Sequence, residues 1–292
     1  MRVGVAGLGL TGSGIANRLL KVGFELSVYN RSMPKAEKFS GSARIANTPA
    51  ELANNCDLVI TVVTDFEALH EVLMGDDGVI NSGNQGLIVT DASTISPSQS
   101  KSCATNLRNN GIEMLGMPVM GGPAAAETGE LVPIVSGSTV AFEKAKPAIE
   151  ALGKNIFYLG DRDGAANAIK LALNLNIALT ASAVSEGITL VRRMGIDPSI
   201  FVQILNSTYF KTGLSERKGP KMAAGNFEPS FHLKNMLKDL ELASGTALAE
   251  KITLPQTALA QQIFRAANNS GYSEMDYTAI CAFLARINGI DK

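Results

Sequence analysis

The sequence is poor in the two side chains that most often bind transition metals. Its 292 residues include two histidines, His70 and His232, and three cysteines, which are scattered and form no C-x-x-C pair. This composition excludes a histidine-rich metal site and argues against a disulfide framework or a zinc site. We therefore expect no bound metal and a reducing, cytoplasmic location. Any acid/base catalysis would fall to lysine, tyrosine, aspartate or glutamate.

The sequence also lacks a surplus of either charge and an uninterrupted apolar run. It has 26 basic and 27 acidic residues, so nothing favours nucleic acid or an anionic membrane as a partner. The N-terminal MRVGVAGLGL has no long apolar core of a secretory signal. The most apolar stretch, 169–191, is interrupted by Lys170, Asn174, Asn176 and Glu186. We expect a buried helix there rather than a membrane span.

The first half of the chain alternates short apolar runs with helical patterns. We predict strands at 2–6, 25–29, 44–45, 58–63, 87–90, 113–115, 134–135 and 157–159. Helical patterns lie between most of them, at about 15–22 and at 34–40, 48–55, 65–73, 96–109 and 142–152. Because strands and helices alternate, we expect an α/β fold with a doubly wound, mainly parallel sheet.

After the strand at 157–159 the alternation stops, and almost every later pattern is helical. A long helix begins near Ala165. Further helices are predicted at 198–206, 214–224, 232–249, 255–269 and 276–287. We therefore predict an N-terminal α/β domain over 1–162 and an all-α C-terminal domain over 163–292, joined by the long helix.

A glycine-rich loop lies between the first predicted strand and the first helix. With the spacing G-x-G-x-x-G, it comprises Gly7, Leu8, Gly9, Leu10, Thr11 and Gly12. Such glycines allow a tight turn, a close approach of the backbone to a pyrophosphate, and close packing of the helix on the strand. The motif in this position predicts a Rossmann-type dinucleotide site. The alternative is a glycine-rich loop that binds nothing.

The end of the second predicted strand indicates which dinucleotide is preferred. A site for NAD(H) places Asp or Glu there to bind the ribose 2′-hydroxyl. This chain has Asn30, Arg31 and Ser32 instead, and Arg31 suits a 2′-phosphate. The segment therefore favours NADP(H) over NAD(H), although Arg31 is also compatible with a solvated turn.

Three polar residues share one face of the long, otherwise apolar helix. At 100° per residue, Asn167, Lys170 and Asn174 fall within about 60° of one another. Burying a lysine is costly, so this face is expected to open on a cleft or a partner. Burial would lower the lysine pKa and suit it to proton transfer. A structural polar stripe with an ion-paired lysine is the alternative.

Four motifs resemble those of the β-hydroxyacid dehydrogenase family, which includes 3-hydroxyisobutyrate dehydrogenase and several semialdehyde reductases. GLGLTGSGIANRLLKVG resembles the cofactor motif, and MPVMGGPAAAETGEL resembles the substrate motif D-x-P-V-S-G-G with A-x-x-G-x-L. Residues 164–174 resemble the catalytic motif, and Lys238-Asp239-Leu240 resembles the C-terminal K-D-L motif. The resemblance extends essentially from end to end.

The resemblance implies hydride transfer between NADP(H) and a small carboxylate substrate, a semialdehyde or keto acid and its hydroxy acid. It implies that Lys170 is the general acid/base and that Asn174 hydrogen-bonds to the substrate. Further cofactor contacts would come from Val63, Thr64, Thr94 and Lys238, and substrate contacts from Met120, Gly121, Gly122, Phe231 and Asp239. It also implies a homodimer or homotetramer.

Two positions depart from the family pattern. Its Asp is Gly116 here, and its Ser, which contacts the substrate, is Met120. Gly121 and Gly122 remain, so their backbone N–H groups are still suited to a carboxylate. Met120 makes the pocket more apolar and removes a hydroxyl, which leaves the substrate open. Glyoxylate, the succinic, methylmalonate and tartronate semialdehydes, and 3-hydroxypropionate-type pairs all remain candidates.

Two other functions remain open. Imine reductases share this architecture, but they usually lack the lysine that Lys170 resembles. A dinucleotide-sensing protein with a degenerate site would bind the cofactor without turnover, whereas the presence of Lys170, Asn174, Lys238 and Asp239 together favours an enzyme.

Overall fold

The computed structural model describes residues 1–290 and divides the chain into two compact units. Unit 1 comprises Met1–Lys170, and unit 2 begins at Leu171. The division falls inside the long helix α8 (Ala165–Arg193), whose first turns belong to unit 1. The sequence placed the boundary after residue 162, before this helix. Because α8 continues from one unit into the other, no linker in the sequence marks the division.

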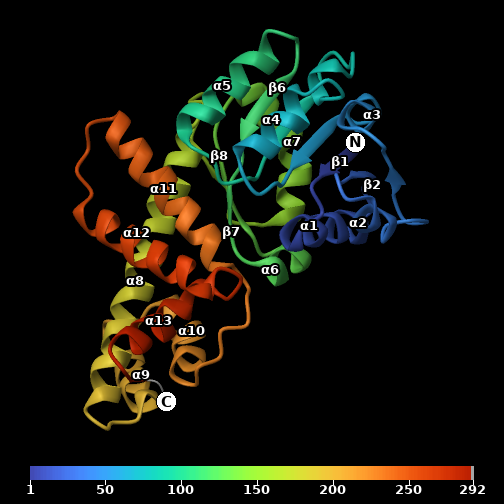
Figure 1. Cartoon of the computed structure of the whole chain (residues 1–292). Helices are drawn as coiled ribbons and strands as arrows, with labels where there is room; N and C mark the ends of the chain where they lie inside the picture. The colour runs from blue at the N-terminus through green and yellow to red at the C-terminus, as the bar shows by residue number, and fades with distance from the viewer. Residues whose placement is uncertain (291–292) are drawn as a thin grey trace. The chain divides into compact units, whose positions relative to one another are not determined.

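A six-stranded, all-parallel sheet forms the centre of unit 1 (Figure 1). Its spatial order is β3 (Arg44–Ile45), β2 (Glu25–Tyr29), β1 (Arg2–Ala6), β4 (Leu58–Thr61), β5 (Ile88–Asp91) and β6 (Glu113–Gly116). The order reverses beside β1, which makes the carboxyl ends of β1 and β4 the point where a doubly wound sheet binds its ligand. The predicted fold class is confirmed.

The central strands are buried on both faces because successive side chains point to opposite sides of the sheet. Val3, Val5 and Ile60 belong to one buried cluster, whereas Ala6 and Val59 belong to the other. The covering helices are α1 (Leu10–Lys21), α2 (Met33–Glu37), α3 (Pro49–Asn54), α4 (Phe66–Met74), η1 (Val79–Asn81), α5 (Pro97–Arg108) and α7 (Thr139–Leu152).

Besides η1, two short elements were absent from the sequence prediction. They are β7 (Val119–Met120) and α6 (Pro123–Thr128), which flank Gly121 and Gly122. β7 pairs antiparallel with β8 (Val132–Val135), which pairs parallel with β9 (Phe157–Tyr158). Elements of two and six residues are too short to show a hydrophobic period, so only packing defines them.

Unit 2 is helical, as predicted. After α8 its helices are α9 (Pro198–Asn206), α10 (Gly213–Ala223), α11 (Leu233–Ala249), α12 (Pro255–Ala267), η2 (Asn268–Tyr272), η3 (Tyr277–Ala279) and α13 (Ile280–Ile287) (Figure 1). Phe264 is fully buried and belongs to the larger of the two buried clusters of unit 2, to which α8 contributes Ala178 and Ala181. By length and composition, α8 is the one helix among residues 1–290 that reaches the threshold for a membrane span. Its Ala178 and Ala181 pack into this cluster.

Candidate functional site

The glycines of the loop after β1 have two different roles: two are required by the packing of the chain, and one leaves open space. Gly7 has φ +100°, and a Cβ there would collide with the Val62 carbonyl oxygen. A Cβ on Gly12 would collide with the Gly7 carbonyl oxygen. These two glycines are therefore required by the turn and by the packing of α1 on it.

Gly9 is different, because nothing in the chain requires it to be glycine. Its φ is −71°, which any residue adopts, and a Cβ there would meet no atom within 4 Å. The missing side chain leaves open space beside the first turn of α1, where Leu10 and Thr11 follow. A backbone exposed in this way suits the close approach of a pyrophosphate. The loop therefore fits a dinucleotide.

The segment after β2 is tied to this loop. The backbone N–H of Leu8 donates to Asn30 Oδ1 at 2.8 Å, and Asn30 Nδ2 donates to the Ser32 carbonyl at 2.9 Å. Arg31 is exposed and makes no ion pair within the described residues. Asn30 thus holds the segment in place, while Arg31, Ser32 and the nearby exposed Lys35 face solvent. Lys35 was missed by the sequence analysis.

A buried hydrogen-bond network links the carboxyl ends of β4 and β5. Thr61 Oγ1 donates to Asp91 Oδ1 at 2.7 Å, and the backbone N–H of Ser93 donates to the same oxygen at 3.1 Å. The Ser93 hydroxyl accepts from the N–H of Val63 at 3.0 Å. The predicted cofactor residues Val63, Thr64 and Thr94 lie on the two loops that this network joins. Asp91, fully buried, was not singled out by the sequence analysis, although an acid at the end of an apolar strand was a signal.

Lys170 lies against the segment that contains Met120. Its Nζ donates to the carbonyl oxygen of Val119 at 2.8 Å and lies 3.3 Å from the Met120 sulfur. Gly121 follows with φ +121°, whereas Gly122 is extended and a Cβ there would meet nothing within 4 Å. The predicted catalytic lysine and the predicted substrate glycines are thus brought together, beside a second glycine position that is open.

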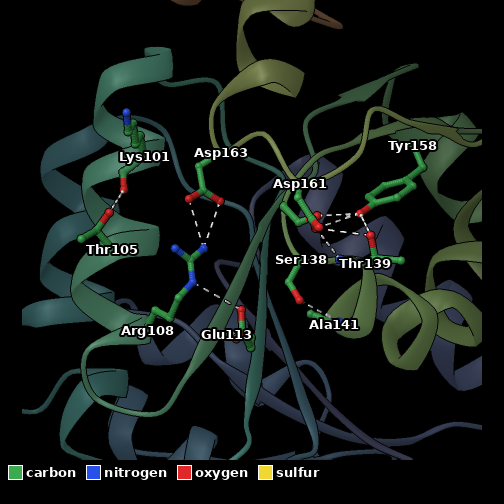
Figure 2. Close-up of polar contacts among 11 residues, drawn as sticks. Lys101, Thr105, Arg108, Glu113, Ser138, Thr139, Ala141, Tyr158, Asp161 and Asp163 are labelled. Atoms are coloured by element: carbon green, nitrogen blue, oxygen red, sulfur yellow. Dashed lines mark hydrogen bonds and ion pairs between the residues drawn. The ribbon is translucent and has the colours of Figure 1, made fainter.

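Two carboxylates anchor the loop that leads into α8 (Figure 2). The Arg108 guanidinium binds both oxygens of Asp163 at 3.1–3.2 Å, and the backbone N–H of Thr139 donates to Asp161 Oδ1 at 2.6 Å. Figure 2 shows the two side chains pointing to different partners, on α5 and α7. The Ser136 hydroxyl also accepts from the N–H of Ala166 at 3.0 Å. These contacts fix the start of the helix that bears Lys170.

Asn167 occupies the space left by Gly116. It is fully buried, and a Cβ on Gly116 would lie 2.8 Å from Asn167 Oδ1 and 3.2 Å from the Ser100 hydroxyl. The family pattern has a larger, acidic side chain at position 116. The departure at Gly116 is therefore accommodated by a polar side chain from the first turn of α8.

The described part of unit 2 brings three of the predicted residues, Asn174, Lys238 and Asp239, together around the buried Asp239 carboxylate. Asn174 Nδ2 donates to Asp239 Oδ2 at 2.6 Å, and Lys238 Nζ lies 3.2 Å from Asp239 Oδ1. Asn174 and Asp239 are 4% and 1% exposed, so these charge-assisted contacts are shielded from water. The K-D pair of α11 and the amide of α8 thus form a single cluster.

Comparison with known proteins identifies the family. Residues 2–160 match the family described as the NAD binding domain of 6-phosphogluconate dehydrogenase, and residues 164–284 match NAD-binding of NADP-dependent 3-hydroxyisobutyrate dehydrogenase. Glyoxylate/succinic semialdehyde reductase 2 of Arabidopsis thaliana is 30% identical over 279 residues, 95% of this chain and 78% of that protein. The 2-hydroxy-3-oxopropionate reductase of Escherichia coli K12 is 32% identical, covering 96% of each chain.

A solved structure agrees. The 3-hydroxyisobutyrate dehydrogenase from Salmonella typhimurium is 27% identical and superposes with a TM-score of 0.88, covering 97% of this chain and 99% of that one. The chain belongs to the β-hydroxyacid dehydrogenase family. As a member it is a pyridine-nucleotide-dependent oxidoreductase of the hydroxyacid dehydrogenase and semialdehyde reductase type.

In this β-hydroxyacid dehydrogenase the predicted substrate residue Phe231 is held by a second buried carboxylate, Asp276. Asp276 Oδ2 is 2.6 Å from Lys218 Nζ and accepts the backbone N–H of Ser230 at 3.0 Å. The Phe231 ring packs edge-on against Tyr277 at 6.3 Å. Burial alone would raise the Asp276 pKa, but the hydrogen bonds from Lys218, Ser230 and Thr278 outweigh it and hold that pKa below its usual range.

No sequence pattern singled out Asp276, because Lys218 and Ser230 lie 58 and 46 residues away from it in the chain. The three cysteines, by contrast, are all buried, and burial raises the pKa of each thiol to about 11. Thiols with such a pKa stay protonated near neutrality and are poor nucleophiles. They belong to the packing of this dehydrogenase rather than to its chemistry.

Proposed function

We propose that this protein is an NADP(H)-dependent reductase that interconverts a small semialdehyde or keto acid and its hydroxy acid, with Lys170 as the general acid/base. One observation carries the proposal. Lys170 Nζ lies at the Val119 carbonyl and the Met120 sulfur, immediately before the glycine pair whose second member is open to a ligand. The proposed proton donor, Lys170, thus contacts the two residues that directly precede the glycines proposed to bind the carboxylate.

The residues that would hold the cofactor fit its chemistry. The open backbone at Gly9 suits the pyrophosphate, and Arg31 with the Ser32 hydroxyl suits a 2′-phosphate. Val63, Thr64, Thr94 and Lys238 complete the proposed cofactor set. When bound, the nicotinamide supplies or accepts the hydride. The absence of a carboxylate at the end of β2 supports NADP(H) over NAD(H).

The chain's own part in the reaction is to bind, orient and transfer a proton. We propose that the backbone N–H groups of Gly121 and Gly122 bind the substrate carboxylate. Phe231 and Asp239 of unit 2 are the further substrate residues that we propose. During reduction, Lys170 as an ammonium donates a proton from Nζ to the carbonyl oxygen. In the reverse direction, neutral Lys170 accepts the hydroxyl proton. Asn174, one helical turn later and held by Asp239, orients that oxygen.

The test is to follow oxidation of NADPH and NADH with a panel of small aldehyde and keto acids, using wild type and Lys170→Ala. We expect rapid NADPH oxidation with at least one semialdehyde and a loss of about 10²–10⁴-fold in kcat for the variant. Cofactor binding by the variant should persist, which separates catalysis from folding. Tight cofactor binding without turnover of any carbonyl or imine would replace this proposal with a dinucleotide-sensing protein.

We further propose that the enzyme acts in the cytoplasm as a homodimer or homotetramer. Support comes from unit 2, where Leu190, Met194 and Ile204 are 66%, 70% and 59% exposed. Several large apolar side chains exposed to water on α8, on α9 and in the turn between them are typical of a subunit interface. No nucleic acid or membrane partner is proposed, since the net charge of −1 offers no basic surface surplus.

A further inference from the structure

Met120 is the side chain that meets the proposed proton donor. Its sulfur lies 3.3 Å from Lys170 Nζ, and it is partly exposed at the end of β7. Its backbone position is fixed on both sides, because Met120 pairs with Val132 of β8 and Gly121 follows with φ +121°. A Cβ on Gly121 would lie 2.9 Å from Leu131, so this turn requires a glycine directly after Met120.

The distance between Lys170 Nζ and the Met120 sulfur limits how far a bound carbonyl oxygen can lie from that sulfur. A carbonyl oxygen that receives a proton from Lys170 must lie about 2.6–3.2 Å from Nζ. The Met120 sulfur is at van der Waals distance from the same nitrogen. The accepting oxygen therefore lies within roughly 6.5 Å of the sulfur, near enough for substituents on the neighbouring carbon to contact the methionine side chain.

A thioether treats those substituents unequally. It is apolar and polarizable, has no hydrogen to donate and is only a weak acceptor. A methyl or methylene group gains contact with it, whereas a hydroxyl loses water and receives no comparable hydrogen bond in return. In such a pocket, kcat/KM for two substrates that differ in one group of this kind differs by roughly tenfold to a hundredfold.

We infer that Met120 is a specificity residue that selects carbonyl acids without a hydroxyl on the carbon next to the reacting carbonyl. Such substrates carry hydrogen or a short alkyl group at that carbon. The inference rests on the proposed function, because it takes Lys170 as the proton donor. It deepens that function by excluding hydroxylated semialdehydes from the good substrates of this enzyme.

Three substrates that differ at one group test the inference. They are 3-oxopropanoate, its 2-methyl derivative and its 2-hydroxy derivative, in which the methyl and hydroxyl groups are similar in size. For wild type with NADPH, we expect kcat/KM for the 2-methyl compound to exceed that for the 2-hydroxy compound by about tenfold or more. Equal or reversed values for wild type would overturn the inference without any variant.

Two variants then locate the cause. Met120→Ser introduces a hydroxyl and should lower the methyl-to-hydroxyl ratio by about tenfold or more. Met120→Leu keeps an apolar side chain of similar size and should preserve the ratio. A serine variant with the wild-type ratio, while still binding NADPH, would refute the role of Met120. If the serine variant does not fold, Met120→Thr provides the same comparison.

A binding measurement separates this inference from the proposed function. Methylmalonate and hydroxymalonate carry a carboxylate in place of the aldehyde and cannot be reduced in this way. Calorimetry in the presence of NADP⁺ should show tighter binding of methylmalonate to wild type, with the preference lost in Met120→Ser. If that preference appears without turnover of any carbonyl acid, the proposed function fails and the selectivity stands. If turnover occurs without the preference, the selectivity fails and the proposed function stands.

Discussion

The two units hold their functional groups by different physical means. Unit 1 uses backbone and missing side chains: the open positions at Gly9 and Gly122, and a carbonyl oxygen and a thioether at Lys170. Unit 2 uses buried carboxylates, Asp239 and Asp276, each 1% exposed and each in contact with a lysine. The glycine positions of unit 1 are therefore sensitive to added volume, whereas the Asp239 and Asp276 clusters of unit 2 are sensitive to lost charge and to pH.

The largest effect is expected from added volume in the glycine loop. Gly12→Ala forces a Cβ into the Gly7 carbonyl and should destabilise unit 1 by about 3 kcal/mol or more. Gly9→Ala is the matched control, because its Cβ meets nothing in the chain. It should leave unfolding in urea unchanged and weaken NADPH binding by at least about tenfold, because the pyrophosphate loses its close approach. Equal unfolding of the two variants would contradict the two roles assigned to these glycines.

Removal of a buried charge should have the next largest effect. Asp276→Asn leaves Lys218 without its carboxylate, and we expect a loss of about 3 kcal/mol at neutral pH. Glu274→Gln, which breaks an exposed ion pair with Lys234, is the control and should change stability far less.

The pH dependence follows from the depressed Asp276 pKa. In the unfolded chain this carboxyl titrates near its ordinary pKa of about 3.9, and in the folded protein it titrates lower. Its stabilising contribution is therefore complete above about pH 4 and is lost as the pH falls through the folded pKa. The stability difference between wild type and Asp276→Asn should shrink in acid. A difference that stays constant from neutral pH to about pH 3 would show that folding does not lower the Asp276 pKa.

The smallest effect is expected at an exposed charge of unit 1. Arg31→Ser should raise the KM for NADPH by about tenfold and leave the KM for NADH nearly unchanged, since only NADPH carries the 2′-phosphate. The effect should weaken with added salt because Arg31 is exposed. Lys35→Ser is the matched variant. A comparison of the rise in the NADPH KM between the two variants shows which cation contributes more to binding of the 2′-phosphate. An equal rise in KM for both cofactors would refute the phosphate contact.

Features whose geometry is local could be predicted from the sequence. The glycine loop follows from residue spacing, and the sequence placed Asn167, Lys170 and Asn174 on one face because helix geometry fixes residues three and four apart. The burial of Asn167 and Asn174, at 0% and 4% exposed, agrees with that face. The alternating strands were found because continuous apolar runs mark strands covered on both sides.

The sequence by itself therefore determined the two-part α/β and all-α fold, the dinucleotide loop and the residue types available for proton transfer. Only the tertiary structure decided their partners. Met120 meets Lys170 across 50 residues of chain, Asp239 meets Asn174 across 65, and Lys218 meets Asp276 across 58. No spacing rule connects such pairs, because their distance depends on how whole helices and strands pack. The contact between Met120 and Lys170 could therefore be known only from the packing of β7 against the first turns of α8.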